Sequence, residues 1–131
     1  MTGLRELMDE ARRLGVVVHL VHIDDDRRAG EYSESSKEVF VDLGLTMAEI
    51  KWTLAHELAH AYYRHTCTTP TNERQADRRA ARTLIDLTDY VLAEAIDPDP
   101  QFIADELGIP RRAVRVFQRE WLPTLSLRRG A

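Results

Sequence analysis

The chain has 131 residues, of which 44% are hydrophobic and 31% are charged, and this composition predicts one domain with a buried core rather than two independent domains. No stretch approaches the roughly 18 uninterrupted apolar residues that a membrane helix needs, and the single cysteine, Cys67, excludes an internal disulfide. The formal net charge of −4 argues against an overall attraction to nucleic acid.

The first predicted element is an amphipathic helix over residues 3–14. Leu4, Leu7 and Ala11 recur there at helical spacing, and Gly15 supplies the stop. Because this segment does not resemble a signal peptide, and because a single cysteine suits a reducing compartment, we expect a cytoplasmic protein.

Three extended segments come next in the chain. The β-branched run over residues 16–23 predicts a strand, and residues 31–35 and 37–43 predict two more. We expect the three strands to form a small antiparallel sheet. Helical patterns fill the remainder, so the order of elements predicts an α+β fold whose helices gather on one side of the sheet. The later helices are expected over residues 46–65, after Pro70, and over 88–96, 100–107 and 111–121.

The helix expected from its capping residue Thr46 to about His65 carries the most informative motif. Its sequence HELAH places His56, Glu57 and His60 in the pattern His-Glu-x-x-His. His56 and His60 lie one turn apart on one face, so both rings can reach one ion, and Glu57 lies about 100° round the helix, where it can reach a water beside that ion. The alternative is an ordinary amphipathic helix that holds the pattern by accident.

A catalytic zinc site needs a third protein ligand and keeps one position open for water. Glu73 and Asp77 are four residues apart on the next helix, and the six-residue break over residues 66–71 lets that helix fold back beside the first. The competing interpretation is a solvated acidic pair among arginines such as Arg74 and Arg78.

The motif HELAH followed by ERQAD resembles the ImmA/IrrE family of metallopeptidases, which are gluzincins with His-Glu-x-x-His plus Glu-x-x-x-Asp. The resemblance extends over residues 1 to about 90 and is most specific over 53–81. It implies a zincin-like metallopeptidase core, expected over residues 1–97, with residues 98–131 as a C-terminal helical extension packed on that core. It further implies zinc as the cofactor, with ligands His56, His60 and Glu73, with Glu57 as the catalytic base, and with Asp77 orienting a ligand histidine.

Such a site predicts zinc-assisted peptide hydrolysis, in which the ion brings the pKa of its water to about 7 and Glu57 takes the proton. The oxyanion also needs a donor, and a tyrosine is the candidate because all five histidines lie in the first half of the chain. Tyr63 projects about 20° from His56 round the helix and is the first choice, while Tyr32 and Tyr90 stay open.

Two further expectations concern the surroundings of the site. His65 should point about 180° away from His56 round the helix, so it is not expected to be a ligand. The strand over residues 37–43 is expected to form an exposed sheet edge that holds an extended substrate.

The resemblance also implies a protein substrate, typically a helix-turn-helix repressor whose cleavage relieves repression in mobile-element immunity or a stress response. The C-terminal segment leaves a second interpretation open, because six arginines and one acidic residue follow Gly108. Arg111, Arg112 and Arg115 would meet DNA phosphates if this segment were a helix-turn-helix. The alternative is then a non-catalytic transcriptional regulator that binds a repressor or DNA and uses a structural metal. Packing on the core, or docking of the repressor, is favoured over DNA contact.

Overall fold

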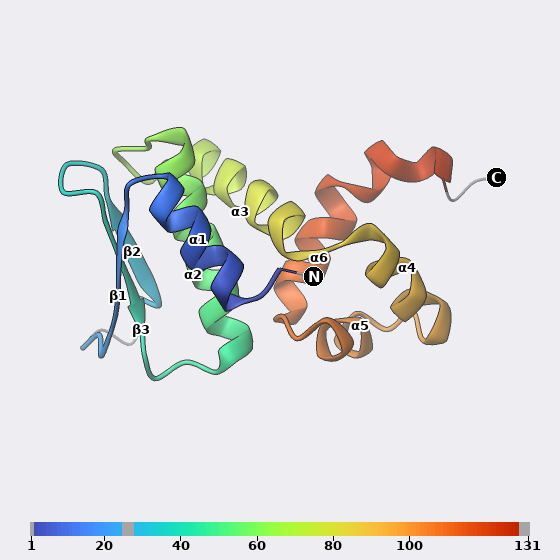
Figure 1. Ribbon diagram of the computed structural model, residues 1–131. Helices are drawn as coiled ribbons and strands as arrows, with labels where there is room; N and C mark the ends of the chain where they lie inside the picture. Colours follow the sequence, from blue (N-terminus) through green and yellow to red (C-terminus); the bar gives the residue numbers. More distant parts are fainter. Residues whose placement is uncertain (1, 25–27, 129–131) are drawn as a thin grey trace.

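The computed structural model describes residues 2–24 and 28–128, without the side chains of 126–128. Over these residues, six α-helices accompany one small sheet (Figure 1), which confirms the predicted α+β fold. The elements in chain order are α1 (Leu4–Arg13), β1 (Val17–Val21), β2 (Gly30–Ser33), β3 (Glu38–Asp42), α2 (Met47–Tyr63), α3 (Pro70–Leu84), α4 (Leu87–Ile96), α5 (Pro100–Leu107), α6 (Arg111–Glu120) and the 3₁₀ helix η1 (Leu122–Arg128).

The sheet has the strand order β1-β3-β2, with β1 parallel and β2 antiparallel to β3. The expectation of a purely antiparallel sheet is therefore wrong for one of its two pairings. The chain reverses direction after each strand, so β1 and β3 run the same way, and the strand order places them side by side. The expected edge strand over residues 37–43 is instead the central one, where Val39 and Val41 are fully buried. The edge beside α2 is formed by β2.

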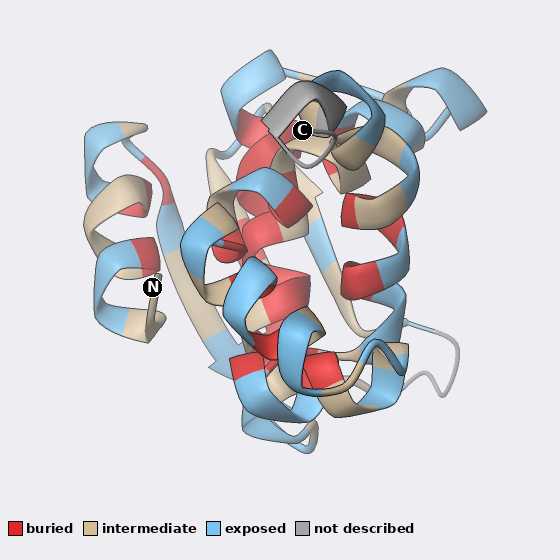
Figure 2. Cartoon of the chain, turned by 90° about the vertical axis from the view of Figure 1, so that its right-hand side faces the viewer, coloured by how far each residue is buried: buried red, intermediate tan, exposed pale blue. Residues whose placement is uncertain are grey.

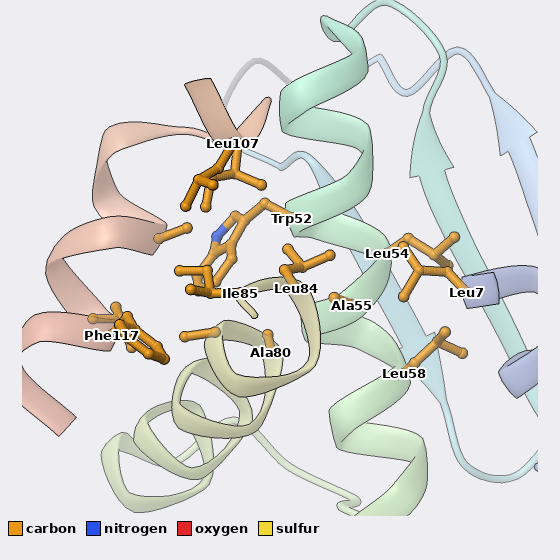
Figure 3. Packing of buried hydrophobic residues seen from close by; sticks show 14 of the residues in the cluster. Leu7, Trp52, Leu54, Ala55, Leu58, Ala80, Leu84, Ile85, Leu107 and Phe117 are labelled. Atoms are coloured by element: carbon orange, nitrogen blue, oxygen red, sulfur yellow. The ribbon is translucent and has the colours of Figure 1, made fainter. Parts of the chain in front are cut away.

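The helix α2 lies in the middle of the molecule, with the sheet and α1 on one side and α3 and the C-terminal helices on the other (Figure 1). Figure 3 shows Leu54 on the side of α2 that faces Leu7 of α1, and Trp52 on the side that faces Ile85. Because apolar partners surround it on several sides, α2 buries most of its length, including the polar residues Glu57 and His60.

The ends of α2 are set by local interactions. The Oγ1 atom of Thr46 accepts a hydrogen bond from the Glu49 amide at 3.2 Å, as expected for an N-cap. At the other end, Arg64 adopts the left-handed conformation, with φ 59° and ψ 42°. The helix therefore ends at Tyr63, two residues before the predicted limit.

The helix α3 packs closely against α2 through alanine side chains. Ala76, Ala80 and Ala81 are fully buried, and small side chains allow two helix backbones to approach closely. Thr69 caps α3 and Pro70 occupies its first turn, so that Glu73 projects from the end of α3 that follows the turn out of α2. Helix packing therefore places this carboxylate beside the histidines of α2.

The C-terminal helices share the hydrophobic core of the preceding elements. Ile103 of α5 and Phe117 of α6 are fully buried and belong to the same cluster as Trp52, and Figure 2 shows the buried segments of the helices turned inward. The division of the chain near residue 97 stays a prediction. Among the described residues, no helix is both long and apolar enough to cross a membrane.

Candidate metal centre

Three side chains from α2 and α3 converge on one point. The Nε2 atoms of His56 and His60 lie 3.2 Å apart. The carboxylate of Glu73 lies 3.4 Å from His56 Nε2 through Oε1 and 2.6 Å from His60 Nε2 through Oε2. The three residues each offer one possible ligand atom, and these three atoms lie within 4.8 Å of one another. The three residues predicted as metal ligands are thus brought together.

The outer nitrogen of each histidine ring has its own partner. His56 Nδ1 lies 2.8 Å from Asp77 Oδ1, at an angle that departs from an ideal hydrogen bond. His60 Nδ1 lies 2.9 Å from His65 Nδ1 in a hydrogen bond. Asp77 can only accept from His56, and Gln75 Oε1, which lies 2.9 Å from Nε2 of His65, leaves Nδ1 of His65 to accept from His60. Both ligand histidines then carry the proton on Nδ1 and a lone pair on Nε2.

This donor set fits a divalent cation. Two Nε2 lone pairs and the Glu73 carboxylate face one another, and Glu73 Oε2 is buried without a hydrogen bond of proper geometry. Electron-pair donors at such distances repel unless a cation lies between them. Zinc–nitrogen bonds of 2.0–2.1 Å in a tetrahedron place two ligand nitrogens about 3.4 Å apart, close to the observed separation of His56 and His60.

Glu57 lies next to these donors and is itself almost completely buried. Burial raises the pKa of its carboxyl group to about 7, and the negative charge of Glu73 adds to the effect while His56 opposes it. Burial also lowers the pKa of His60, with His56 as a second cause. For His56, burial acts to lower the pKa, but Asp77 and the neighbouring carboxylates outweigh it and raise the pKa. A carboxyl group with a pKa near neutrality can both accept and return a proton.

Hollows open on two sides of Glu57. One has a volume of about 430 Å³ and is lined by His60, Glu73 and the edge strand β2. The other measures about 290 Å³ and is lined by His56, Asp77 and Arg112, among other residues. Glu57 lines both hollows, so its side chain lies where the two approach each other.

Gly30 at the start of β2 permits the close approach of this strand to α2. A Cβ atom built on Gly30 would lie 2.6 Å from Thr53 Cγ2, 2.9 Å from the Phe40 carbonyl oxygen and 3.4 Å from Glu57 Cγ. Any larger residue would therefore force Gly30 or the atoms that it contacts to shift. Sequence analysis missed this role, because nothing local to Gly30 indicates which helix will face it.

The tyrosine expected to stabilise the oxyanion is not beside Glu57. Tyr63 stacks on His65, with 5.3 Å between ring centroids, and lines a separate hollow with Arg79 and Trp121. Tyr63 follows His56 by seven residues, and this separation corresponds to about 10 Å along the helix axis. The two side chains therefore do not meet, although they project at similar angles round the helix.

The two other tyrosines weighed for this role lie in different surroundings. Tyr32 lines the larger hollow, where its hydroxyl donates to Glu34 at 2.6 Å. Tyr90 is fully buried, and its hydroxyl donates to Glu94 at 2.8 Å. Of the three tyrosines, Tyr32 is therefore the one that lines a hollow together with Glu57.

The position of His65 also differs from the expectation. It was expected to face away from the ligands, but it forms a hydrogen bond to His60, and its Nε2 atom lies 2.9 Å from Gln75 Oε1. The 180° separation holds only inside a continuous helix, and the left-handed Arg64 ends the helix first. Sequence analysis missed His65 and Gln75 because no glycine marks this turn.

The arginines considered for DNA binding lie on α6 or at its start. Gly108, with φ 69°, caps the C-terminal end of α5 shortly before α6 begins. All three arginines are exposed, and Arg112 also forms an ion pair with Glu49 at 2.6 Å and lines the smaller hollow beside Glu57. Among the other arginines that follow Gly108, residue 129 lies outside the described residues.

Comparison with known proteins returned one family. The model of the family Peptidase_M78, described as the IrrE N-terminal-like domain, matches residues 11–117, which include every residue of the site described above. Neither the curated proteins nor the solved structures gave a significant match.

Proposed function

Because the chain belongs to the Peptidase_M78 family, and peptidases of this family are generally metal-dependent, we propose that it is a zinc-dependent endopeptidase. One observation carries the proposal: the lone pairs of His56, His60 and Glu73 converge beside a buried carboxyl group, that of Glu57. A purely structural site would close its fourth position with another protein ligand. Here the described residues offer three ligands beside a hollow.

The chemistry divides between the metal and the protein. Zinc, when bound, would supply Lewis acidity and lower the pKa of a coordinated water to about 7. Glu57 would take the proton of the attacking water and later return it to the leaving amine. Its position among His56, Glu73 and the strand β2 buries most of this side chain, while its carboxyl group still lines the hollows in which the substrate would bind.

The edge strand β2 is the proposed binding surface for the peptide. It pairs with β3 on one side only, and its residues Gly30, Glu31 and Tyr32 line the larger hollow. An extended peptide can add to such an edge through main-chain hydrogen bonds. The close packing of Gly30 against Thr53 then fixes how far that peptide lies from Glu57.

The proposed physiological substrate is a helix-turn-helix repressor, which places the protein in the cytoplasm. This proposal is supported by the family resemblance, and α5 and α6 are the proposed docking elements. The test is to express the chain with the repressor encoded by a neighbouring gene and to measure the masses of the products. Fragments that form with wild type and are absent with Glu57→Gln are expected. An intact repressor in both samples would contradict this choice of substrate.

A second candidate function is a regulator that binds a repressor or DNA and does not cleave. The exposed Arg111 and Arg115 on α6, after the turn at Gly108, favour it. DNA binding predicts a duplex mobility shift that weakens with salt and disappears when both arginines are neutralised. If the Glu57→Gln variant still binds zinc and regulates as well as wild type, this second function is favoured over the peptidase.

A further inference from the structure

His60 belongs to a chain of hydrogen bonds that leads away from the metal centre. Its Nδ1 atom lies 2.9 Å from Nδ1 of His65, and Nε2 of His65 lies 2.9 Å from Oε1 of Gln75. An amide oxygen can only accept, so the proton lies on Nε2 of His65. The Nδ1 atom of the neutral His65 ring is then an acceptor, and His60 donates to it.

The direction of these hydrogen bonds decides which ring nitrogen of His60 carries a proton and which carries a lone pair that can bind a metal. With its proton on Nδ1, His60 presents a lone pair on Nε2, the atom that lies 3.2 Å from Nε2 of His56 and 2.6 Å from Glu73. If the bonds ran the other way, His60 would carry its proton on Nε2 and could not coordinate through that atom.

The backbone around His65 holds the ring in place. Arg64 is in the left-handed conformation, and the amide of His65 donates to the carbonyl oxygen of His60 at 3.0 Å. Arg64 Nε also donates to Glu34 Oε2 at 3.1 Å, which ties the turn to the hairpin of β2 and β3. The ring of Tyr63 stacks on His65. A non-glycine residue with positive φ persists where its surroundings enforce it, so His65 is built into the turn.

We propose that His65, held by Gln75, is a positioning residue that fixes the tautomer and orientation of the metal ligand His60. The inference rests on the proposed function, because it assumes that a metal binds at this centre. The two ligand histidines then have different outer partners: a carboxylate, Asp77, for His56 and a neutral imidazole for His60. Partners of this kind orient metal ligands and contribute to metal affinity.

Zinc affinity of the whole chain, measured by competition with a chromophoric chelator, tests the proposal. His65→Ala should bind zinc about 10–100-fold more weakly than wild type. Gln75→Leu should weaken binding in the same direction while leaving every ligand in place. Gln101→Leu is the matched control, because it makes the same change at an exposed glutamine of α5 that lies outside the site, and it should keep wild-type affinity. Gln75 is also exposed, so Gln75→Leu is expected to fold even if His65→Ala does not.

A second measurement reads the tautomer directly. In the metal-free wild type, long-range ¹⁵N–¹H spectra of the histidine rings should show the proton of His65 on Nε2 and that of His60 on Nδ1. In metal-free Gln75→Leu, where no metal fixes the tautomer of His60, this preference should be lost. A proton on Nδ1 of His65, or equal zinc affinity of wild type, His65→Ala and Gln75→Leu, would overturn the positioning role and leave the proposed function intact. A wild type that binds no zinc would overturn both.

Discussion

Asp77 of α3 lies 2.8 Å from His56 of α2, measured from Oδ1 to Nδ1. The contact joins the two helices that carry the ligands, four residues beyond Glu73. A carboxylate at this position holds a proton on the outer nitrogen of His56 and so leaves Nε2 free for a metal. The contact therefore orients one ligand of α2 from the helix that carries Glu73.

Replacing Asp77 should weaken the metal site without removing a ligand. Asp77→Ala is expected to lower zinc affinity about 10–100-fold, as measured by chelator competition. Asp105→Ala is the control, because this exposed carboxylate on α5 accepts a hydrogen bond from Gln101 and lies outside the site. If Asp77→Ala and wild type bind zinc with equal affinity, Asp77 does not contribute to the metal site.

Metal removal should lower the thermal stability of the chain. A ligand that binds only the folded state adds about 2.7 kcal/mol to the free energy of unfolding when its free concentration is about 100 times its Kd. Chelation of a zinc-loaded sample should therefore reduce Tm, and added zinc should restore it. Glu73→Gln, which weakens one of the three ligands, should show a much smaller response. A Tm that does not respond to zinc in wild type would contradict a metal centre.

Glu57→Gln should separate metal binding from catalysis. Glutamine keeps the size of the side chain but cannot act as a base, so cleavage should fall about 100–10,000-fold, while zinc affinity stays near that of wild type. Repressor cleavage, followed by mass analysis, and chelator competition measure the two properties on the same samples. Undiminished cleavage by the variant would show that another group acts as the base.

Gly30→Ala should disturb the edge strand beside Glu57. The new Cβ atom would lie 2.6 Å from Thr53 Cγ2 and 2.9 Å from a backbone oxygen, so the strand or its neighbours must shift, and overpacking of this kind costs about 1–3 kcal/mol of stability. Cleavage should fall as well, because β2 lines the hollow. Gly44→Ala is the matched control, since its nearest neighbour, Asp42 Oδ1, would lie 3.5 Å away. Identical denaturation curves for both variants would refute the packing role of Gly30.

The stabilising effect of Glu34 should depend on pH. Hydrogen bonds from Lys37 and then Tyr32 are the main causes that lower the pKa of Glu34 from 4.5 to about 2. A lowered carboxyl pKa stabilises the folded state above pH 4.5, and this contribution is lost as the pH falls through 2. The Tm of Glu34→Gln should therefore lie furthest below that of wild type near neutral pH. The two Tm values should converge as the pH falls from 4.5 to about 2.

A second background controls for the Glu34 substitution itself. In Lys37→Met the first of these partners is gone, so the further change Glu34→Gln should lower Tm less than it does in the presence of Lys37. The pH dependence would be contradicted if the Tm difference between Glu34→Gln and wild type stayed constant between pH 7 and the acid range. A constant difference of roughly the size that an ordinary surface substitution causes would be such a result.

Local patterns determined much of this protein. The spacing of His56, Glu57 and His60, and of Glu73 and Asp77, follows from the helical repeat, so the sequence alone could place both groups on helix faces. Thr46 begins α2 through contacts within one turn. The α+β fold class also follows from the order of helical and extended patterns, because each pattern is read within a short window.

Tertiary structure alone decided the remainder. The central position of β3, the approach of Gly30 to α2 and the location of Tyr63 each depend on how distant elements pack, and helical or strand periodicity carries no information about packing partners. His65 reaches His60 only because Arg64 takes up a left-handed conformation at the end of α2. Such a turn is favoured by contacts across the fold, among them the bond from Arg64 to Glu34, and contacts between residues thirty positions apart leave no local signal in the sequence.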